Sequence, residues 1–151
     1  VQPIYSYCNN MDGLRNDVAE KARDFVQKYV CGSIDNDDLF RSRGHAYIKI
    51  AREEPHIFRL YLFQERKNIS SLEDLYRTET NPAIAEMIAK KLNISLPVAR
   101  QLHLNMLIYT IGIGTIFSVT SSLISESEIF RQQEQAYRTF LKSALEDKDN
   151  E

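Results

Sequence analysis

Residues 101–125 read QLHLNMLIYTIGIGTIFSVTSSLIS and contain no Asp, Glu, Lys or Arg. A charge-free segment of this length is typical of a helix enclosed on all sides by protein, or of a membrane span, for which about 20 apolar residues suffice. The segment also contains many Ser and Thr residues, together with His103 and Asn105. Because polar groups are costly inside a bilayer, we expect a helix buried in protein and keep a single membrane span as an alternative.

The segments on either side of this run keep a helical period. From Met11 onward, apolar residues recur three or four positions apart, with charged residues mostly between them. No segment alternates apolar and polar residues as a strand does. The last segment carries an apolar face broader than one neighbouring helix would cover. We therefore expect an all-α helical bundle that dimerises through its last two long helices.

Several residues mark where the helices begin and end. Gly32 and Pro55 are stop signals, and Asn81 followed by Pro82 is a start signal. Two capping boxes are also expected, in which a Ser side chain caps the helix and a Glu three positions later bonds back. They are Ser70 with Glu73, before a short helix over 72–79, and Ser125 with Glu128, before the last helix.

Composition narrows the class of protein. A chain of 151 residues that is 43% hydrophobic and 26% charged suits one globular domain. Its net charge of -2 gives no overall attraction to nucleic acid. The two cysteines, Cys8 and Cys31, are too few for a disulfide framework or a zinc site. We expect reduced thiols in a cytoplasmic protein without a leader, and Val1 in place of an initiator Met indicates a fragment.

The sequence lacks the usual motifs of catalysis. It contains no G-x-S-x-G elbow, no phosphate-binding Gly loop and no H-E-x-x-H pair, and His45, His56 and His103 do not have the spacing of metal ligands. The acidic residues of 35–38 and 53–54 lie at expected helix ends, where capping explains them. We therefore expect neither an enzyme nor a bound cofactor or metal.

Three stretches resemble TetR-family transcriptional regulators. Residues 1–14 (VQPIYSYCNNMDGL) are similar to the end of that family's recognition helix and the entry to its fourth helix. Residues 44–60 (GHAYIKIAREEPHIFRL) look like its aliphatic and aromatic helix, Pro-terminated turn and following apolar segment. Residues 110–114 (TIGIG) stand where the family often has a small-residue motif. Cys8 and Met11 depart from the family's usual aromatic residue and Lys.

The resemblance implies a ligand-responsive DNA-binding regulator, acting as a repressor. Residues 1–10 would be the remnant of a helix-turn-helix domain, and 11–151 the helical ligand-binding and dimerisation domain. The partners would be a second copy of the chain, operator DNA in the full-length protein, and a small apolar or amphipathic effector, with no membrane. The alternative is a helical small-molecule-binding or oligomerisation module without a DNA role. The DNA-binding candidates on the remnant are Gln2, Pro3, Tyr5 and Tyr7.

Two further sets of candidate residues follow from the helical pattern. The ligand-binding candidates offer aromatic walls, thioethers and a few polar groups, although such stripes also occur in ordinary cores. They are Tyr47, Phe58, Tyr61, Leu62, Met87, His103, Met106, Leu107 and Thr110. The dimer candidates would leave a large apolar patch exposed in a monomer. They are Ile113, Ile116, Phe117, Thr120, Ile129, Gln133, Ala136 and Phe140.

Overall fold

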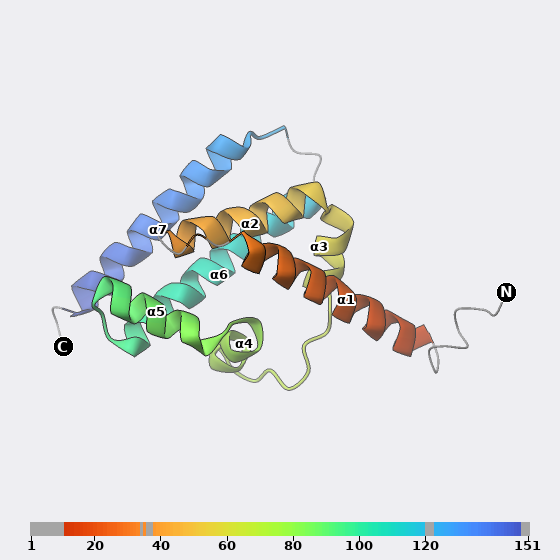
Figure 1. Cartoon of the computed structure of the whole chain (residues 1–151), viewed down its shortest axis with the longest axis horizontal. Coiled ribbons are helices and arrows are strands. Elements are labelled where there is room, and N and C mark those ends of the chain that lie inside the picture. The colour runs from red at the N-terminus through yellow and green to blue at the C-terminus, as the bar shows by residue number, and fades with distance from the viewer. Residues whose placement is uncertain (1–10, 34, 36–37, 120–122, 149–151) are drawn as a thin grey trace. The chain divides into compact units, whose positions relative to one another are not determined.

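The computed structural model describes residues 11–33, 35, 38–119 and 123–148 (Figure 1). Over these residues the chain forms seven α-helices and no strand, which confirms the all-α prediction. Their bounds are α1 Met11–Gly32, α2 Leu39–Glu53, α3 Pro55–Leu62, α4 Leu72–Glu79, α5 Pro82–Leu92, α6 Leu96–Val119 and α7 Glu126–Lys148. The DNA-binding candidates Gln2, Pro3, Tyr5 and Tyr7, and the dimer candidate Thr120, lie outside the described residues.

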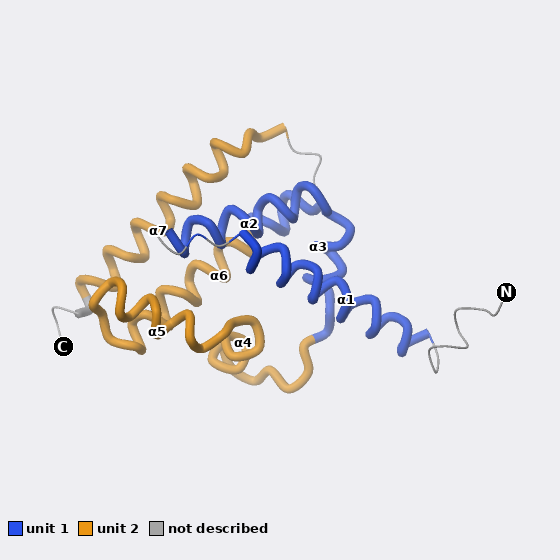
Figure 2. Tube along the Cα trace, viewed as in Figure 1, with its two compact units in different colours: residues 1–65, 113–122 blue, residues 66–112, 123–151 orange. Residues whose placement is uncertain are grey.

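The helices form two compact units, shown in different colours in Figure 2. Unit 1 comprises residues 1–65 and 113–122, and so holds α1, α2, α3 and the last turns of α6. Unit 2 comprises residues 66–112 and 123–151, with α4, α5, the first part of α6 and α7. The part of the chain expected as one helical domain thus contains two compact units, each with its own buried side chains.

Unit 1 is built by three helices that pack against one another. α1 contributes Val26 and Val30 to the interior, and α2 contributes Ile48 and Ile50, all of them buried. Pro55 lies in the first turn of α3, where its missing N–H leaves no helical hydrogen bond unmade. The Pro55 ring ends α2 and starts α3, so that Glu54 alone connects the two helices.

Unit 2 has a core in which α4, α5 and α6 meet. Tyr76, Ala85 and Leu104 form a buried cluster. The expected start of α5 is confirmed, because the Asn81 side chain accepts a hydrogen bond of 3.0 Å from the backbone N–H of Ala83. These local signals fix where each short helix begins, and thereby which side chains reach the core.

The capping box of α4 lies one residue later than expected. The Ser71 hydroxyl accepts a hydrogen bond of 3.1 Å from the Asp74 N–H, and the hydroxyl of Ser70 donates one of 2.7 Å to Asp74 Oδ2. The prediction of Ser70 with Glu73 was therefore wrong, since Glu73 instead accepts a hydrogen bond from Arg77. The hydrogen bonds from Ser70 and Ser71 lower the pKa of the Asp74 carboxyl below its ordinary value of 3.8.

Among the described helices, one is long and apolar enough to cross a membrane by length and composition. It is α6, whose most apolar window has a mean hydropathy of 1.5, with 44% of that window buried inside the chain. The core helix of a protein without a membrane also has these properties. Length and composition alone therefore give weak support for the membrane alternative.

Candidate functional site

An aromatic cluster lies in the interior of unit 1. It joins Tyr47 of α2 to Phe58 and Tyr61 of α3, three residues predicted to bind a ligand, and all three are buried. The ring centroids of Tyr47 and Tyr61 are 6.4 Å apart, and those of Phe58 and Tyr61 are 5.7 Å apart. Tilted pairs at these distances are favourable arrangements of aromatic rings. The structure thus brings three of the predicted ligand residues together in one place.

Gly114, in the last turns of α6, makes room for this cluster. A Cβ atom at this position would lie 2.8 Å from Cζ of Phe58, closer than real Cβ contacts allow. Gly114 belongs to the TIGIG stretch, which stands where the resemblance implies a small-residue motif. Within unit 1 that neighbour is the Phe58 ring.

Sequence reasoning missed Arg43, which lies one helical turn before Tyr47 on α2. Arg43 is 8% exposed, and its guanidinium carbon lies 5.9 Å from the centroid of the Tyr47 ring. The distance is within the range of cation–π contacts. The signal was present in the sequence, because Leu39, Arg43 and Tyr47 are spaced four apart and so share a helix face.

The hydroxyl of Tyr47 is the polar end of this cluster. Tyr47 is 2% exposed, and its hydroxyl has no hydrogen-bond partner among the described residues. A buried hydroxyl without a partner costs free energy, and nearly all such groups in proteins are paired. Unit 1 therefore contains a buried hydroxyl group without a partner on a ring that a guanidinium group contacts.

The other predicted ligand residues are distributed differently. Leu62 is half-buried in unit 1, while Met106, Leu107, Thr110 and His103 are buried in unit 2. Met87 is 47% exposed, and it lies in α5 off the buried stripe that contains Ala85 and Ile88. The structure thus places these residues in two sets, one in each unit, with Met87 on the surface.

His103 has a partner within unit 2. Its Nδ1 atom lies 2.9 Å from the hydroxyl of Tyr76, and the two rings meet edge to face with centroids 5.4 Å apart. Both residues are buried. This geometry is what an interior imidazole needs to satisfy one of its ring nitrogens.

A second buried polar pair joins α6 to α7 in unit 2. The Gln133 side chain donates a hydrogen bond of 3.0 Å from Nε2 to Oγ1 of Thr110. Gln133 Oε1 is buried and has no partner among the described residues. Thr110, a ligand candidate, and Gln133, a dimer candidate, therefore bond to each other inside one chain.

Unit 2 also contains a buried carboxylate that forms an ion pair. Glu79, at the end of α4, is 2% exposed, and Arg66 donates to it through Nε at 2.5 Å. A charge-assisted contact of this kind offsets part of the cost of removing both charges from water. Among the described residues, no three His, Cys, Asp or Glu side chains are grouped to hold a metal ion.

The predicted dimer residues differ in their exposure. Ile116 is 54% exposed, and Ile113, Ala136 and Phe140 are half-buried. The Phe140 ring lies edge-on to Tyr109, with centroids 6.3 Å apart. The remaining described candidates, which the single chain already buries, are Phe117, Ile129 and Gln133. A second copy would therefore contact Ile116 more readily than these three.

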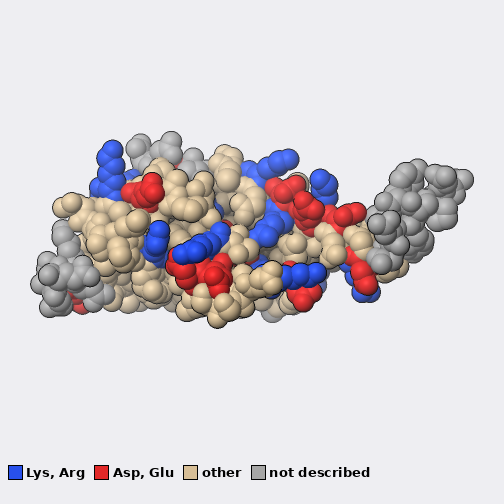
Figure 3. Space-filling view, turned by 90° about the horizontal axis from the view of Figure 1, so that it is seen from below, with Lys and Arg blue, Asp and Glu red and all other residues tan. Residues whose placement is uncertain are grey.

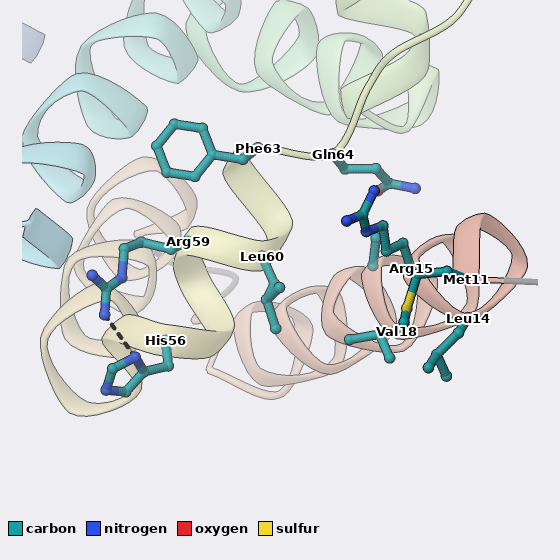
Figure 4. Close-up of a pocket in the computed structure, with 10 residues that line it drawn as sticks. Met11, Leu14, Arg15, Val18, His56, Arg59, Leu60, Phe63 and Gln64 are labelled. Carbon is teal, nitrogen blue, oxygen red and sulfur yellow. Dashed lines mark hydrogen bonds between the residues drawn. The ribbon is translucent and has the colours of Figure 1, made fainter. Parts of the chain in front are cut away.

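An open apolar groove lies on the surface of unit 1 between the first half of α1 and the end of α3 (Figure 4). Its volume is about 650 Å³, and the exposed side chains of Met11, Val18 and Leu60 contribute to it. Figure 4 shows Arg15 towards one end and a hydrogen bond from Arg59 to His56 at the other. The groove is thus apolar along its length, with a guanidinium group near each end.

Charges of both signs occur on the surface. On the face drawn in Figure 3, Lys and Arg side chains alternate with Asp and Glu side chains. This mixture agrees with the net charge of -2.

Comparisons with known proteins do not identify the chain, because it matches no protein-family model, no curated protein sequence and no solved structure.

Proposed function

We propose that this chain is the ligand-binding and dimerisation part of a cytoplasmic TetR-type transcriptional regulator that acts as a repressor. The proposal rests on the residues that carry the resemblance and on the order of the helices. Residues 44–60 comprise the later part of α2, a connection that ends at Pro55, and most of α3, which match the helix, turn and apolar segment that the resemblance implies. The chain also ends in two long helices, α6 and α7.

The observation that carries the proposed dimer is an exposed apolar stripe on α6. Ile116 and Val119, in the part of α6 that belongs to unit 1, are both exposed. Positions 116 and 119 are three apart, so they share one face of the helix. An apolar face of this kind marks an interaction site, and a second copy of the chain would cover it.

The groove between α1 and α3 supports the proposed connection to a DNA-binding head. It begins at Met11, directly after residues 1–10, which the resemblance assigns to the end of the reading helix. An apolar surface at this place is where the head would pack in the full-length protein. Contact of the DNA-binding head with α1 would let a movement of that helix change the position of the head.

A mechanism follows from the geometry of paired reading heads. Two heads in a two-fold dimer must match half-sites about 34 Å apart, so a change in helix angle alters the fit to DNA. A small molecule in the helical core shifts this equilibrium only through its different affinity for the two arrangements. The buried cluster of Tyr47, Phe58 and Tyr61 lies on α2 and α3, and both helices contact α1. A ligand at this cluster would therefore change the position of α1.

Sedimentation of the chain tests the dimer. We expect the wild type to be a dimer at micromolar concentration. The substitution Ile116→Glu places a charge in the proposed interface and should raise the dissociation constant about tenfold or more. Leu72→Glu is the matched control, because Leu72 is 60% exposed and lies outside the proposed interface. A monomeric wild type, or equal effects of both variants, would contradict the proposed interface.

The DNA role is tested on the full-length native protein. We expect its sequence upstream of Val1 to contain a helix-turn-helix pattern, and the protein to shift a DNA fragment from its own promoter region in a gel assay. A full-length protein without that pattern and without DNA binding would leave the alternative, a helical binding or oligomerisation module. The mixed charges of Figure 3 are the observation in favour of that alternative.

A further inference from the structure

Arg43 is a buried cation for which the described part of the chain supplies no anion. Its one recorded interaction is the contact of its guanidinium with the Tyr47 ring. Removing a charged group from water without a counter-charge is costly, and buried guanidinium groups are normally paired with a carboxylate. The ring face offsets only part of this cost.

The Tyr47 hydroxyl, at a neighbouring position, also lacks a hydrogen-bond partner among the described residues. Arg43 and Tyr47 are four residues apart on α2, so their side chains lie on one face of the helix. Both can donate hydrogen bonds, and neither has an acceptor among the described residues. The Tyr47 hydroxyl is thus a buried donor without an acceptor, and the Arg43 guanidinium over the same ring adds a positive charge, so an acceptor that carries negative charge suits both groups.

We propose that Arg43 and Tyr47 bind the carboxylate of a small amphipathic acid, whose apolar body packs against the rings of Phe58 and Tyr61. The planar guanidinium group matches the two oxygens of a carboxylate, and the phenol can donate to the same group. A carboxylate carries one negative charge, which balances the single guanidinium, whereas a doubly charged phosphate would leave excess charge buried. This inference rests on the proposed small-molecule-binding role and names the chemical class of its effector.

A binding series of three indoles tests the charge preference. The chain contains no Trp, so the fluorescence of an indole ligand can be excited selectively in its presence. Indole-3-acetate, tryptophol and tryptamine share one ring and differ in an acid, an alcohol or an amine. We expect the full chain to bind the acid at least about tenfold more tightly than the alcohol, and the amine most weakly.

Variants of α2 assign this preference to residues. Arg43→Gln should abolish the difference between acid and alcohol, and Tyr47→Phe should reduce it several-fold. Arg41→Gln is the matched control, since it removes the same charge from the same helix at an exposed position next to Asp38. It should leave the preference unchanged.

The stability of the ligand-free chain separates this role from a purely structural one. If Arg43 served only to pack on Tyr47, Arg43→Met would lower the melting temperature. An unpaired cation retained for a ligand predicts the opposite, a rise of about 2 °C or more, because an apolar side chain of similar length replaces a buried charge. Indole-3-acetate should then raise the melting temperature of the wild type but not that of Arg43→Met.

The outcomes distinguish this inference from the proposed regulator. Failure of the acid to bind, equal binding of acid and alcohol, or a lower melting temperature of Arg43→Met each overturns the carboxylate site. None of these results bears on dimer formation or on DNA binding, which the sedimentation and gel experiments measure separately. Tight binding of tryptophol with no effect of Arg43→Gln would leave a neutral effector for the regulator and no role for Arg43.

Discussion

Units 1 and 2 both bury polar side chains, but they differ in the partners that they provide. In unit 2, contacts between side chains that include a buried group join Glu79 with Arg66, Tyr76 with His103, and Thr110 with Gln133. Of these groups, Gln133 Oε1 lacks a partner. In unit 1, the Tyr47 hydroxyl is buried without a partner among the described residues, and the Arg43 guanidinium lies over the Tyr47 ring with no described carboxylate beside it.

The difference distinguishes buried polar side chains that hold helices together from buried polar side chains that still lack a partner. A satisfied buried pair fixes the arrangement of the helices that carry it, as Tyr76 and His103 do for α4 and α6. An unsatisfied donor contributes nothing to stability and costs desolvation free energy. Proteins break local rules of this kind mainly at functional sites. If the proposed function holds, the paired groups of unit 2 would fix its helices, and the Tyr47 hydroxyl of unit 1 would be available to a ligand.

The largest effect is expected where a buried pair of unit 2 is broken. Arg66→Ala removes the cation that pairs with Glu79 and leaves a carboxylate that is 2% exposed without its guanidinium partner. We expect the free energy of unfolding at neutral pH to fall by about 3–5 kcal/mol, because the remaining charge must stay buried or take up a proton. Urea denaturation followed by circular dichroism measures the change.

An exposed ion pair of the same unit serves as control for Arg66. Arg77 donates to Glu73 at 3.0 Å one turn apart on α4, and both side chains are accessible to solvent. Arg77→Ala should change the free energy of unfolding by no more than about 0.5 kcal/mol, the range of surface ion pairs within helices. Similar losses for the two variants would mean that burial of Glu79 does not distinguish its ion pair from a surface pair.

Removing the hydroxyl group from one tyrosine in each unit compares the contribution of that group to the free energy of unfolding. Tyr76→Phe removes the hydroxyl that contacts His103 and should cost about 1–2 kcal/mol of unfolding free energy, since the imidazole nitrogen loses its partner. Tyr47→Phe removes a hydroxyl without a recorded partner and should be neutral or slightly stabilising in the ligand-free chain. Urea denaturation of both variants, under identical conditions, gives the two values.

The sign of the Tyr47 result decides whether the comparison holds. A loss for Tyr47→Phe as large as that for Tyr76→Phe would mean that the Tyr47 hydroxyl is already satisfied in solution. In that case unit 1 would not differ from unit 2 in its polar interior. The proposed carboxylate site would lose one of its two donors.

Helix positions could be predicted well from the sequence because their signals are local. Pro55 and the pair Asn81 and Pro82 act through their own backbone, so α3 and α5 begin where these residues place them. The capping box of α4 was misplaced by one residue, because adjacent serines at 70 and 71 both precede an acidic residue three positions later. The choice between them depends on the backbone geometry of the loop, which composition does not specify.

The candidate site was harder to predict, because it depends on contacts between distant segments. Tyr47, Phe58 and Tyr61 were identified by their size and spacing, and the structure does bring them together. Arg43 was not among the candidates, although its spacing of four from Leu39 and Tyr47 places it on the same helix face. Met87 was included for its thioether, although the helical period of α5 already placed it off the buried stripe.

The predicted dimer face shows a second limit of sequence reasoning. The apolar faces of α6 and α7 were expected to cover each other across two copies. Phe117, Ile129 and Gln133 are instead buried within the single chain, while Ile116 stays exposed. Periodicity shows that a face must be covered, but it does not say whether the same chain or a partner covers it.

The smallest expected effect concerns the carboxyl of Asp74 in unit 2. Hydrogen bonds from Ser70 and Ser71 favour its charged form and lower its pKa below 3.8. Because the folded-state pKa lies below the unfolded value, the carboxylate stabilises the fold fully above about pH 4, and this contribution is lost as the pH falls through the folded-state pKa.

Carbon NMR of the Asp74 carboxyl measures this pKa directly. The titration midpoint should lie below 3.8 in the wild type and move back towards 3.8 in Ser70→Ala, since the Ser70 hydroxyl is the largest cause of the shift. Asp74→Asn should make the stability of the chain less dependent on pH between about 3 and 5, because this group no longer titrates. A midpoint at or above 3.8 in the wild type would show that the Ser70 contact does not persist in solution, and the α4 capping box would then depend on Ser71 alone.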